Sequence, residues 1–468
     1  MPERSLPLTA TPRSGDHTLL DSLAPLLSAW LPGQRWFAGQ GGSVGRLTLV
    51  SATELLPRPA PGASAPGLLH LLVRTGQADC YQLLLGVREV LPPELAPARI
   101  GRPADGPLRG LTLYEALHDP RLTGVLLERL RTPGRLGPLR FTRAPGGAVP
   151  SGPTGRLLDA EQSNSSVVYG SVCILKVFRR VGPGTNPDLE LPLALARAGC
   201  AHVPAPTAWF EAEGRRPDGS SLTLGVLQPF LPGSGDGWHL ALGALAERRD
   251  FSAAARALGR TTAEVHAGLA SALPTTVLRR SQLEQLSRGM TERLHQATAA
   301  VPALRPYRTG LRDAFGALDA LARGGAARRA QRIHGDLHLG QALHSPTDNR
   351  WRLIDFEGEP ASPLAERRRP QPAVRDVAGI LRSFDYAACQ RGTGEPWAEE
   401  WAAANRAAYC RGYAEVAGAD PREDAALLRA FETDKAIYEV LYEARHRPAW
   451  LPVPMSAIRR LATADAPR

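Results

Sequence analysis

The sequence predicts an α+β fold with two lobes, in which a sheet-rich front half precedes a helical back half. The chain has 468 residues, more than one hydrophobic core usually serves, so we expect two or three packed units. Short strand-like runs alternate with connections rich in Pro, Gly and Ala in the front half, and long helical segments rich in Ala and Arg follow from about residue 232. Hydrophobic residues make up 43% and charged residues 22%, which is typical of a globular protein.

The first 95 residues predict a small module of one helix and three strands. Apolar residues recur with a helical period at 17–31, although Pro25 favours a kink or a late start there. A joint rich in proline follows at 92–107, and the sequence changes character again near residue 232. We therefore predict three regions, a cap module at 1–95, an N-lobe at 96–231 and a C-lobe at 232–468.

The expected elements are short strands in the front half and long helices in the back half. The strand-like runs cover 45–56, 68–74, 81–87 and 139–143. The clearest helical periods cover 252–269, 283–300 and 311–323.

Composition excludes several classes of protein. No apolar run approaches the roughly 18 residues of a membrane span, and the N-terminus lacks a signal peptide, so a cytoplasmic protein without membrane contact is expected. The five cysteines are scattered and form no C-x-x-C pair, which argues against a disulfide framework and a zinc site. The formal charge is +10, but the basic residues are spread along the chain, so nucleic-acid binding is not expected.

Lysine is rare in this chain. Only Lys176 and Lys435 occur, and the other 54 basic residues are arginine. A compact ammonium and a planar guanidinium are not interchangeable where geometry is tight. Both lysines are therefore candidate site residues, although chance survival is the plainer alternative.

The first lysine lies in a predicted β-hairpin at 162–178, with its turn at Gly170 and Ser171. Small polar residues precede the first β-branched run, and their backbone N–H groups and hydroxyls could face an anion, as a glycine-rich loop does. These residues are Ser163, Asn164, Ser165 and Ser166. No Walker A pattern competes for a phosphate role.

A helix is predicted to start just after this hairpin. Asn186 is typical of an N-cap, Pro187 of the first helical position, and Glu190 lies in the first turn. In a kinase, a strand lysine is held by a glutamate of the next helix so that its ammonium reaches the ATP phosphates, and Lys176 and Glu190 follow that order. The alternative is an edge hairpin whose lysine is solvated and whose Glu190 complements the helix dipole.

Two carboxylates are expected to meet further along the chain. The run HGDLHLGQ at 334–341 is followed by a polar turn at 345–349 and then by Asp355, so a hairpin would bring Asp355 back to Asp336 and Gln341. The order Asp, four residues, amide, then Asp-Phe reproduces the catalytic and metal-binding motifs of kinases. It predicts that Asp336 is the base or orienter of the acceptor hydroxyl, and that Gln341 and Asp355 hold Mg²⁺. The alternative is a surface hairpin with incidental acids.

These motifs and their flanking sequence resemble the bacterial maltokinases, within the superfamily of aminoglycoside phosphotransferase-like kinases. The resemblance lies in HGDLHLGQ at 334–341, LIDFEGEP at 353–360, VRDVAGILRSFDYA at 374–387, KVFRR at 176–180, QSNSS at 162–166, NPDLE at 186–190, QRWF at 34–37 and KAIYEVLYE at 435–443. It therefore covers nearly the whole chain, and only Ser166 departs from the expected threonine.

The resemblance implies transfer of the ATP γ-phosphate to the anomeric hydroxyl of maltose. The product is maltose 1-phosphate, a precursor of α-glucan and glycogen. It also implies ATP and Mg²⁺ as cofactors, a protein-kinase-like fold with a cap on the N-lobe, and ATP between the lobes. Gln162 joins the phosphate-binding residues, and the backbone at Gln228 and Phe230 would bind adenine. A complex with another enzyme of the α-glucan pathway is left open.

The second lysine lies on a predicted helix with a polar and aromatic face. Lys435, Tyr438, Glu439 and Tyr442 are spaced to share that face, which suits a sugar with many hydroxyls and apolar C–H faces. The alternative is an ordinary amphipathic helix with tyrosines in the core. Weaker candidates for acceptor contacts are Arg382 and Asp385.

Two other functions remain open from the sequence. The first is a kinase of the same fold that acts on another sugar or an aminoglycoside, because a fold does not fix a substrate. The second is a catalytically inactive module that binds nucleotide or glucan.

Overall fold

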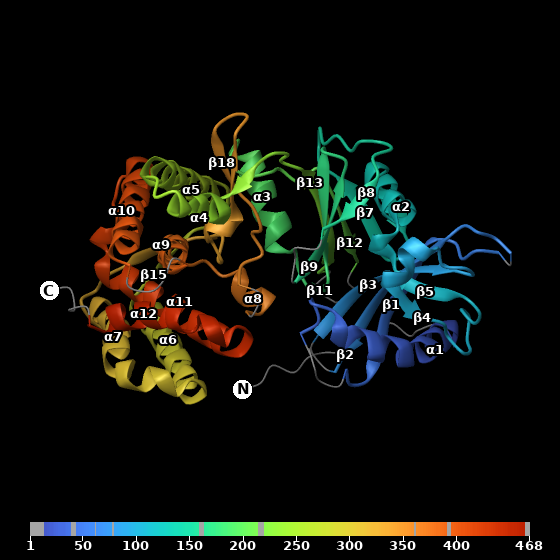
Figure 1. The fold of residues 1–468 in the computed structure, drawn as a ribbon, viewed down its shortest axis with the longest axis horizontal. Coiled ribbons are helices and arrows are strands. Elements are labelled where there is room, and N and C mark those ends of the chain that lie inside the picture. The colour runs from blue at the N-terminus through green and yellow to red at the C-terminus, as the bar shows by residue number, and fades with distance from the viewer. Residues whose placement is uncertain are drawn as a thin grey trace. The chain divides into compact units, whose positions relative to one another are not determined.

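The computed structural model describes residues 14–38, 44–60, 62–76, 79–158, 163–213, 220–359, 362–390 and 395–463. Its contacts divide the chain into two compact units. The first unit is Met1–Glu190 with Ala205–Pro232, and the second is Leu191–Pro204 with Gly233–Arg468. Sheets dominate the first unit and helices the second, which confirms the predicted α+β fold (Figure 1). The division of the first unit at residue 95 stays a prediction.

A six-stranded sheet begins the first unit, with strand order β1-β2-β3-β5-β4 and with β11 paired to β3. Helix α1 packs on this sheet through Leu20, Leu23 and Leu27, which share one buried cluster with apolar side chains of β2 and β3 (Figure 1). The expected helix and strands therefore form one module. The bounds are α1 Ser14–Trp30, β1 Leu47–Leu56, β2 Gly67–Thr75, β3 Asp79–Arg88, β4 Arg99–Gly101, β5 Thr112–Glu115 and β11 Arg180–Val181.

A seven-stranded sheet completes the first unit, in the order β6-β7-β12-β13-β10-β9-β8. Its strands are β6 Gly134–Leu136, β7 Leu139–Arg143, β8 Gly155–Leu157, β9 Asn164–Tyr169, β10 Cys173–Phe178, β12 Ala208–Ala212 and β13 Leu222–Pro229. Helix α2 (Pro120–Arg131) lies beside it, and helix α3 (Pro187–Arg197) follows β11 in the chain. The predicted hairpin is the antiparallel pair β9 and β10, at the centre of which Lys176 faces Ser166 in register.

The two sheets of the first unit are joined by a buried glutamine. The Gln82 side chain in β3 is fully buried, and its Nε2 donates to the carbonyl oxygens of Phe178 at 2.7 Å and Leu224 at 2.8 Å. Its Oε1 lies 2.9 Å from Nε2 of His70, whose pKa burial lowers to about 4. A neutral His70 can therefore donate to Gln82 at pH 7, and every hydrogen bond of the glutamine amide crosses a strand boundary.

Helices dominate the second unit, with two small sheets. The helices are α4 Gly237–Ala246, α5 Ser252–Ala272, α6 Arg280–Ala300, α7 Arg308–Arg323, α8 Leu364–Arg367, α9 Val374–Cys389, α10 Pro396–Ala417, α11 Ala425–His446 and α12 Pro452–Thr463. The strands are β14 Gly235–Asp236, β15 Thr276–Leu278, β16 Arg328–Ala330, β17 Ala342–Ser345 and β18 Arg350–Leu353. No helix among the described residues is long and apolar enough to cross a membrane.

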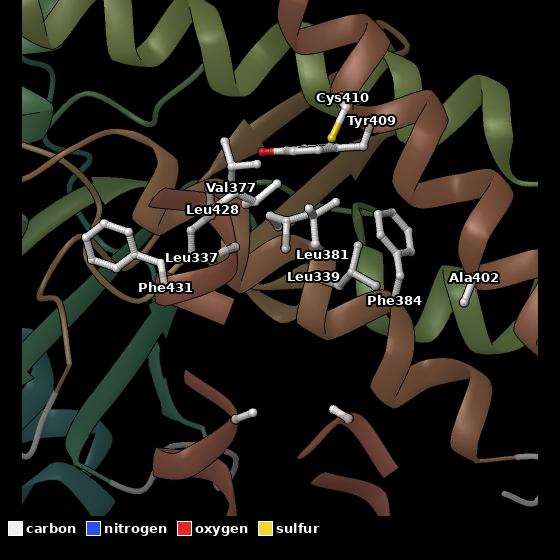
Figure 2. Packing of buried hydrophobic residues seen from close by; sticks show 14 of the residues in the cluster. Leu337, Leu339, Val377, Leu381, Phe384, Ala402, Tyr409, Cys410, Leu428 and Phe431 are labelled. Carbon is white, nitrogen blue, oxygen red and sulfur yellow. The ribbon is translucent and has the colours of Figure 1, made fainter. Parts of the chain in front are cut away.

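The loop before β17 is fixed to the helices by alternate side chains. Leu337 is 1% exposed and Leu339 is fully buried, and both lie among apolar side chains of α9 and α11 (Figure 2). Asp336 and His338, which alternate with the two leucines, carry polar groups of the loop. Burial of the leucines therefore decides which way the polar residues point.

We predict that Gln82→Leu destabilises the fold. The leucine fills the space but leaves the carbonyl oxygens of Phe178 and Leu224 without their buried donor, which should cost about 2–3 kcal/mol of unfolding free energy. Chemical denaturation of the purified variant measures this loss. Thr48→Val, at an exposed position of β1, is the control and should be nearly neutral. A loss below about 0.5 kcal/mol in Gln82→Leu would show that the glutamine does not join the sheets.

Candidate active site

Lys176 is buried in the hairpin of the first unit and is held by a carboxylate. The residue is 8% exposed, and its Nζ lies 3.0 Å from Oδ2 of Asp188 in the first turn of α3. The Phe178 ring lies on the same strand, with its centroid 5.7 Å from Nζ. A buried ammonium that keeps a carboxylate partner stays charged and keeps one orientation, as a phosphate-binding lysine requires.

Asp188 is a partner of Lys176 that sequence reasoning missed. Its backbone N–H donates to Oδ1 of Asn186 at 2.9 Å, so the predicted N-cap also fixes the aspartate. Asp188 is 3% exposed, whereas Glu190 is half-buried. The signal was present, because both acids lie in the predicted first turn, but the kinase pattern favoured the longer side chain. The catalytic role of Glu190 stays a prediction.

The small polar residues before Lys176 form the start of β9. Asn164, Ser165 and Ser166 are all buried, and Ser165 Oγ accepts a hydrogen bond from Nε of Arg179 at 2.8 Å. Ser163 is exposed, and its Oγ accepts from Nδ2 of Asn164 at 3.3 Å. The remaining member of the predicted set, Gln162, lies outside the described residues.

The segment predicted to bind adenine lies at the end of β13, with Gln228 in the strand and Phe230 just after it. Gln228 is the register partner of Ile174, and the Phe230 N–H donates to the carbonyl oxygen of Val172 at 2.9 Å. The Phe230 amide is therefore already used within the first unit. The adenine-binding role of Gln228 and Phe230 stays a prediction that rests on the other backbone groups of this segment.

In the second unit, one buried carboxylate holds the loop that carries Asp336. Asp376, 1% exposed in the first turn of α9, accepts from the backbone N–H of His334 at 2.7 Å and of Gly335 at 2.8 Å. Nε2 of His266 lies 3.0 Å from the same carboxylate. Burial raises the pKa of Asp376, but His266 and the backbone donors outweigh it and lower the pKa overall. Sequence reasoning did not assign this role to Asp376.

Gly335 allows the loop to turn before the aspartate. Its φ of 86° lies in the left-handed region, and a Cβ there would lie 3.3 Å from the Cα of Gly358. A larger residue would be strained and would push against the segment after Asp355. The glycine of the HGD motif is thus required by backbone geometry.

The structure brings the predicted residues Asp336 and Lys435 together. Oδ1 of Asp336 lies 2.8 Å from Nζ of Lys435, which comes from α11. Burial raises the pKa of Asp336, but Lys435 and His338 outweigh it and lower the pKa to about 2. Burial lowers the pKa of Lys435, but Asp336 and Glu359 raise it overall. Each group therefore keeps its charge at neutral pH.

Gln341 and Asp355 also meet, because β17 and β18 form the predicted fold-back. Nε2 of Gln341 donates to Oδ2 of Asp355 at 2.7 Å, so an amide and a carboxylate, both sources of hard oxygen ligands, lie side by side. Asp355 has a φ of 65°, in the left-handed region that is uncommon outside glycine. No cluster of three or more His, Cys, Asp or Glu suited to a metal occurs among the residues the structure describes. Magnesium binding by Gln341 and Asp355 stays a prediction.

A pocket opens beside Asp336 within the second unit, with a volume of about 180 Å³. Lys435 and Tyr438 line it, as predicted. Two ion pairs also line this pocket. Sequence reasoning missed them because each joins residues that are far apart in the chain. They are Arg293 with Asp434, at 2.8 Å, and Arg375 with Glu359, at 3.1 Å.

Three predicted acceptor residues form a buried charge network instead of lining this pocket. The Arg382 guanidinium is 1% exposed and lies 2.6 Å from Glu439 and 2.9 Å from Asp385. Asp385 also pairs with Arg406 and Arg460. The network joins α9, α10, α11 and α12, so its evident effect is to fix these helices. Direct acceptor contacts by Arg382, Asp385 and Glu439 stay a prediction.

The predicted tyrosines stack along α11. The rings of Tyr438 and Tyr442 have centroids 6.4 Å apart and an angle of 26° between their planes. Nζ of Lys435 lies 4.8 Å from the Tyr438 ring centroid. Both tyrosines are half-buried, so a line of aromatic surface runs from the Asp336–Lys435 pair along the helix.

Part of the chain matches a known domain, and about two thirds of it is similar to two kinases. Residues 30–119 match the maltokinase N-terminal cap domain. A glucosamine kinase of Streptacidiphilus jiangxiensis is 31% identical over 334 residues, which cover 66% of this chain and 73% of that protein. A glucosamine kinase of Mycolicibacterium smegmatis is 29% identical over 326 residues, covering 65% and 79%.

Similarity to a solved structure extends over almost the whole chain. A glucosamine kinase solved in complex with glucosamine, ADP and inorganic phosphate superposes with a TM-score of 0.66 and 25% identity, covering 97% of this chain and all of that one. The chain therefore belongs to the family of these glucosamine kinases, and it is an ATP-dependent sugar kinase with a maltokinase N-terminal cap domain.

Proposed function

We propose that this kinase transfers the γ-phosphoryl group of ATP to the anomeric hydroxyl of maltose and releases maltose 1-phosphate. The acceptor oxygen forms the new bond to the γ-phosphorus, the bond to the β–γ bridging oxygen breaks, and ADP leaves with that oxygen. The hydroxyl proton passes to Asp336 or to water. The maltokinase-like motifs and the match of the cap domain support this choice.

The observation that carries the proposal is the aromatic line on α11. The pocket beside Asp336 has a volume of about 180 Å³, below the range of roughly 300–1,000 Å³ that drug-sized ligands occupy, so it suits one pyranose ring. Tyr438 lines that pocket, and Tyr442 lies one turn further along the helix. A second glucose unit would place its C–H face on Tyr442.

Asp336 would orient the acceptor more than it would deprotonate it. A carboxyl with a pKa of about 2 is a weak base, but it accepts a hydrogen bond from a hydroxyl well. Lys435 forms an ion pair with this carboxylate, and its ammonium can also donate a hydrogen bond to a sugar oxygen. Catalysis of phosphoryl transfer rests mainly on such positioning and on neutralising charge.

The phosphates would be held by the residues of the hairpin and by Gln341 with Asp355. Lys176 would donate to phosphate oxygens, and Ser163 to Ser166 would add hydroxyl and backbone donors. Magnesium, when bound by Gln341 and Asp355, would neutralise charge on the phosphates. Loss of either ligand should reduce turnover by orders of magnitude.

An amino sugar is the second candidate acceptor, favoured by the glucosamine kinase relatives and by the charge of the pocket. The pocket is lined by the acids Asp336, Glu359, Glu366, Asp376 and Asp434, against the cations Arg293, Arg367, Arg375 and Lys435. One excess negative charge tolerates an ammonium group and disfavours an anionic sugar.

We predict that maltose is phosphorylated with a higher kcat/KM than glucosamine or glucose. A screen of these acceptors and kanamycin with radiolabelled ATP measures the products, and Asp336→Asn serves as the inactive control. If only glucosamine is phosphorylated, the acceptor is the amino sugar and not maltose. Absence of transfer to every acceptor, with ATP bound, would indicate an inactive binding module.

We predict that Asp188→Asn impairs ATP use more than Glu190→Gln does. The first change leaves the buried ammonium of Lys176 without its observed partner, and should lower kcat/KM for ATP by about ten- to a hundredfold. Both changes remove one charge from the same helical turn, so each variant controls for the other. Steady-state kinetics with varied ATP and thermal unfolding separate catalysis from stability. A larger loss in Glu190→Gln would identify the glutamate as the working partner.

We predict that Lys435→Met brings the acid limb of the pH–rate profile up into the range above pH 4. Activity needs the carboxylate of Asp336, which is present above its pKa and is lost as the pH falls through it. With the ammonium in place that pKa is about 2, but without it burial raises the pKa of Asp336. The profile of kcat/KM is measured between pH 4 and 8, where wild type should show no limb from Asp336 and Lys435→Met should show one. Tyr438→Phe keeps the ammonium and should leave the limb in place, whereas an unmoved limb in Lys435→Met contradicts the assignment.

A further inference from the structure

We propose that Glu359 is a specificity-determining residue, whose carboxylate accepts a hydrogen bond from the acceptor hydroxyl next to the one that is phosphorylated. In maltose this is the 2-hydroxyl of the reducing glucose. The proposal rests on the proposed function, in that the acceptor sugar occupies the pocket beside Asp336. Nothing in the motif pattern of kinases singles out this glutamate.

Glu359 is placed by a turn and fixed by an arginine. It follows Gly358, whose φ of 72° turns the chain after Asp355, and its side chain is 14% exposed. Oε2 accepts from Nη2 of Arg375 at 3.1 Å, and Nη1 of the same guanidinium donates to Oε1 of Gln371. Arg375 is thus held at two points, and the described contacts leave Oε1 of Glu359 for a ligand.

Glu359 lines the same pocket as Lys435 and Tyr438 of α11. Burial raises the pKa of Tyr438 to about 12, and Glu359 is the next cause of that rise. Burial lowers the pKa of Lys435, but Asp336 and Glu359 raise it overall. The charge of Glu359 therefore acts on two of the side chains by which α11 lines the pocket.

This geometry gives the acceptor two carboxylates and one ammonium. Asp336, Glu359 and Lys435 all line the pocket, whose volume of about 180 Å³ suits a pyranose ring. Asp336 would take the reacting hydroxyl, and Glu359 a neighbouring one. A hydrogen bond to a charged acceptor is stronger than one to a neutral acceptor, so a sugar that lacks the neighbouring donor should bind less well.

The test compares Glu359→Gln with Glu400→Gln on two acceptors. Glu400 is exposed on α10 and does not line the pocket, so its substitution removes the same charge elsewhere and is the control. Initial rates are measured for the full-length enzyme with maltose and with maltose that is 2-deoxy at its reducing glucose. Thermal unfolding checks that each variant is folded.

We expect Glu359→Gln to raise the KM for maltose by about ten- to a hundredfold, with the KM for ATP within about twofold of wild type. On the 2-deoxy acceptor the same substitution should have little effect, because the hydroxyl that Glu359 contacts is missing. Glu400→Gln should resemble wild type on both acceptors.

Two outcomes overturn the inference and one overturns the proposed function instead. An unchanged KM for maltose in Glu359→Gln, or an equal penalty on both acceptors, shows that Glu359 does not contact the 2-hydroxyl. If wild type uses glucosamine and not maltose, the proposed function fails. The inference then predicts a larger penalty for Glu359→Gln on glucosamine than on glucose, because an ammonium replaces the 2-hydroxyl, and an equal penalty refutes it.

Discussion

The active-site loop depends on one carboxylate buried behind it. Asp376 accepts hydrogen bonds from the N–H groups of His334 and Gly335, and these two residues lead directly into Asp336. Such a buried charge is costly unless its oxygens are fully used, and His266 supplies the remaining partner. Further along the loop, Leu337 and Leu339 pack among apolar side chains of α9 and α11 (Figure 2). The position of Asp336 is therefore largely set by its neighbours in the loop.

A network of buried ion pairs fixes helices of the second unit relative to one another. Arg382 is almost fully buried, so removal of a single partner would strand a guanidinium in the core. The network that it forms with Asp385 and Glu439 fixes α9 and α11 relative to each other. Because Asp376 lies on α9 and Lys435 on α11, the same network sets the separation of the loop support and the ammonium. Arg382, Asp385 and Glu439, which the sequence suggests as acceptor contacts, can thus support the site indirectly by fixing these two helices.

Local patterns in the sequence predicted the fold class and the hairpins, but not the contacts between distant segments. The hairpins of Lys176 and of Asp355 were predictable because strand, turn and strand follow one another in the sequence. The ion pair of Lys176 with Asp188 was not, since two acids in one turn differ only in three-dimensional placement. Glu359 and its pocket were missed for a different reason. Its partners lie on α9 and α11, and no spacing rule relates distant helices.

The scarcity of lysine agrees with the chemistry of the site. Nζ of Lys435 lies 2.8 Å from Oδ1 of Asp336 and 4.8 Å from the centroid of the Tyr438 ring. Lys176 is buried between a strand and the start of α3, where it pairs with Asp188. Asp336 and Glu359 favour the charged form of Lys435. At both positions a compact ammonium faces a carboxylate, in a chain that elsewhere uses arginine.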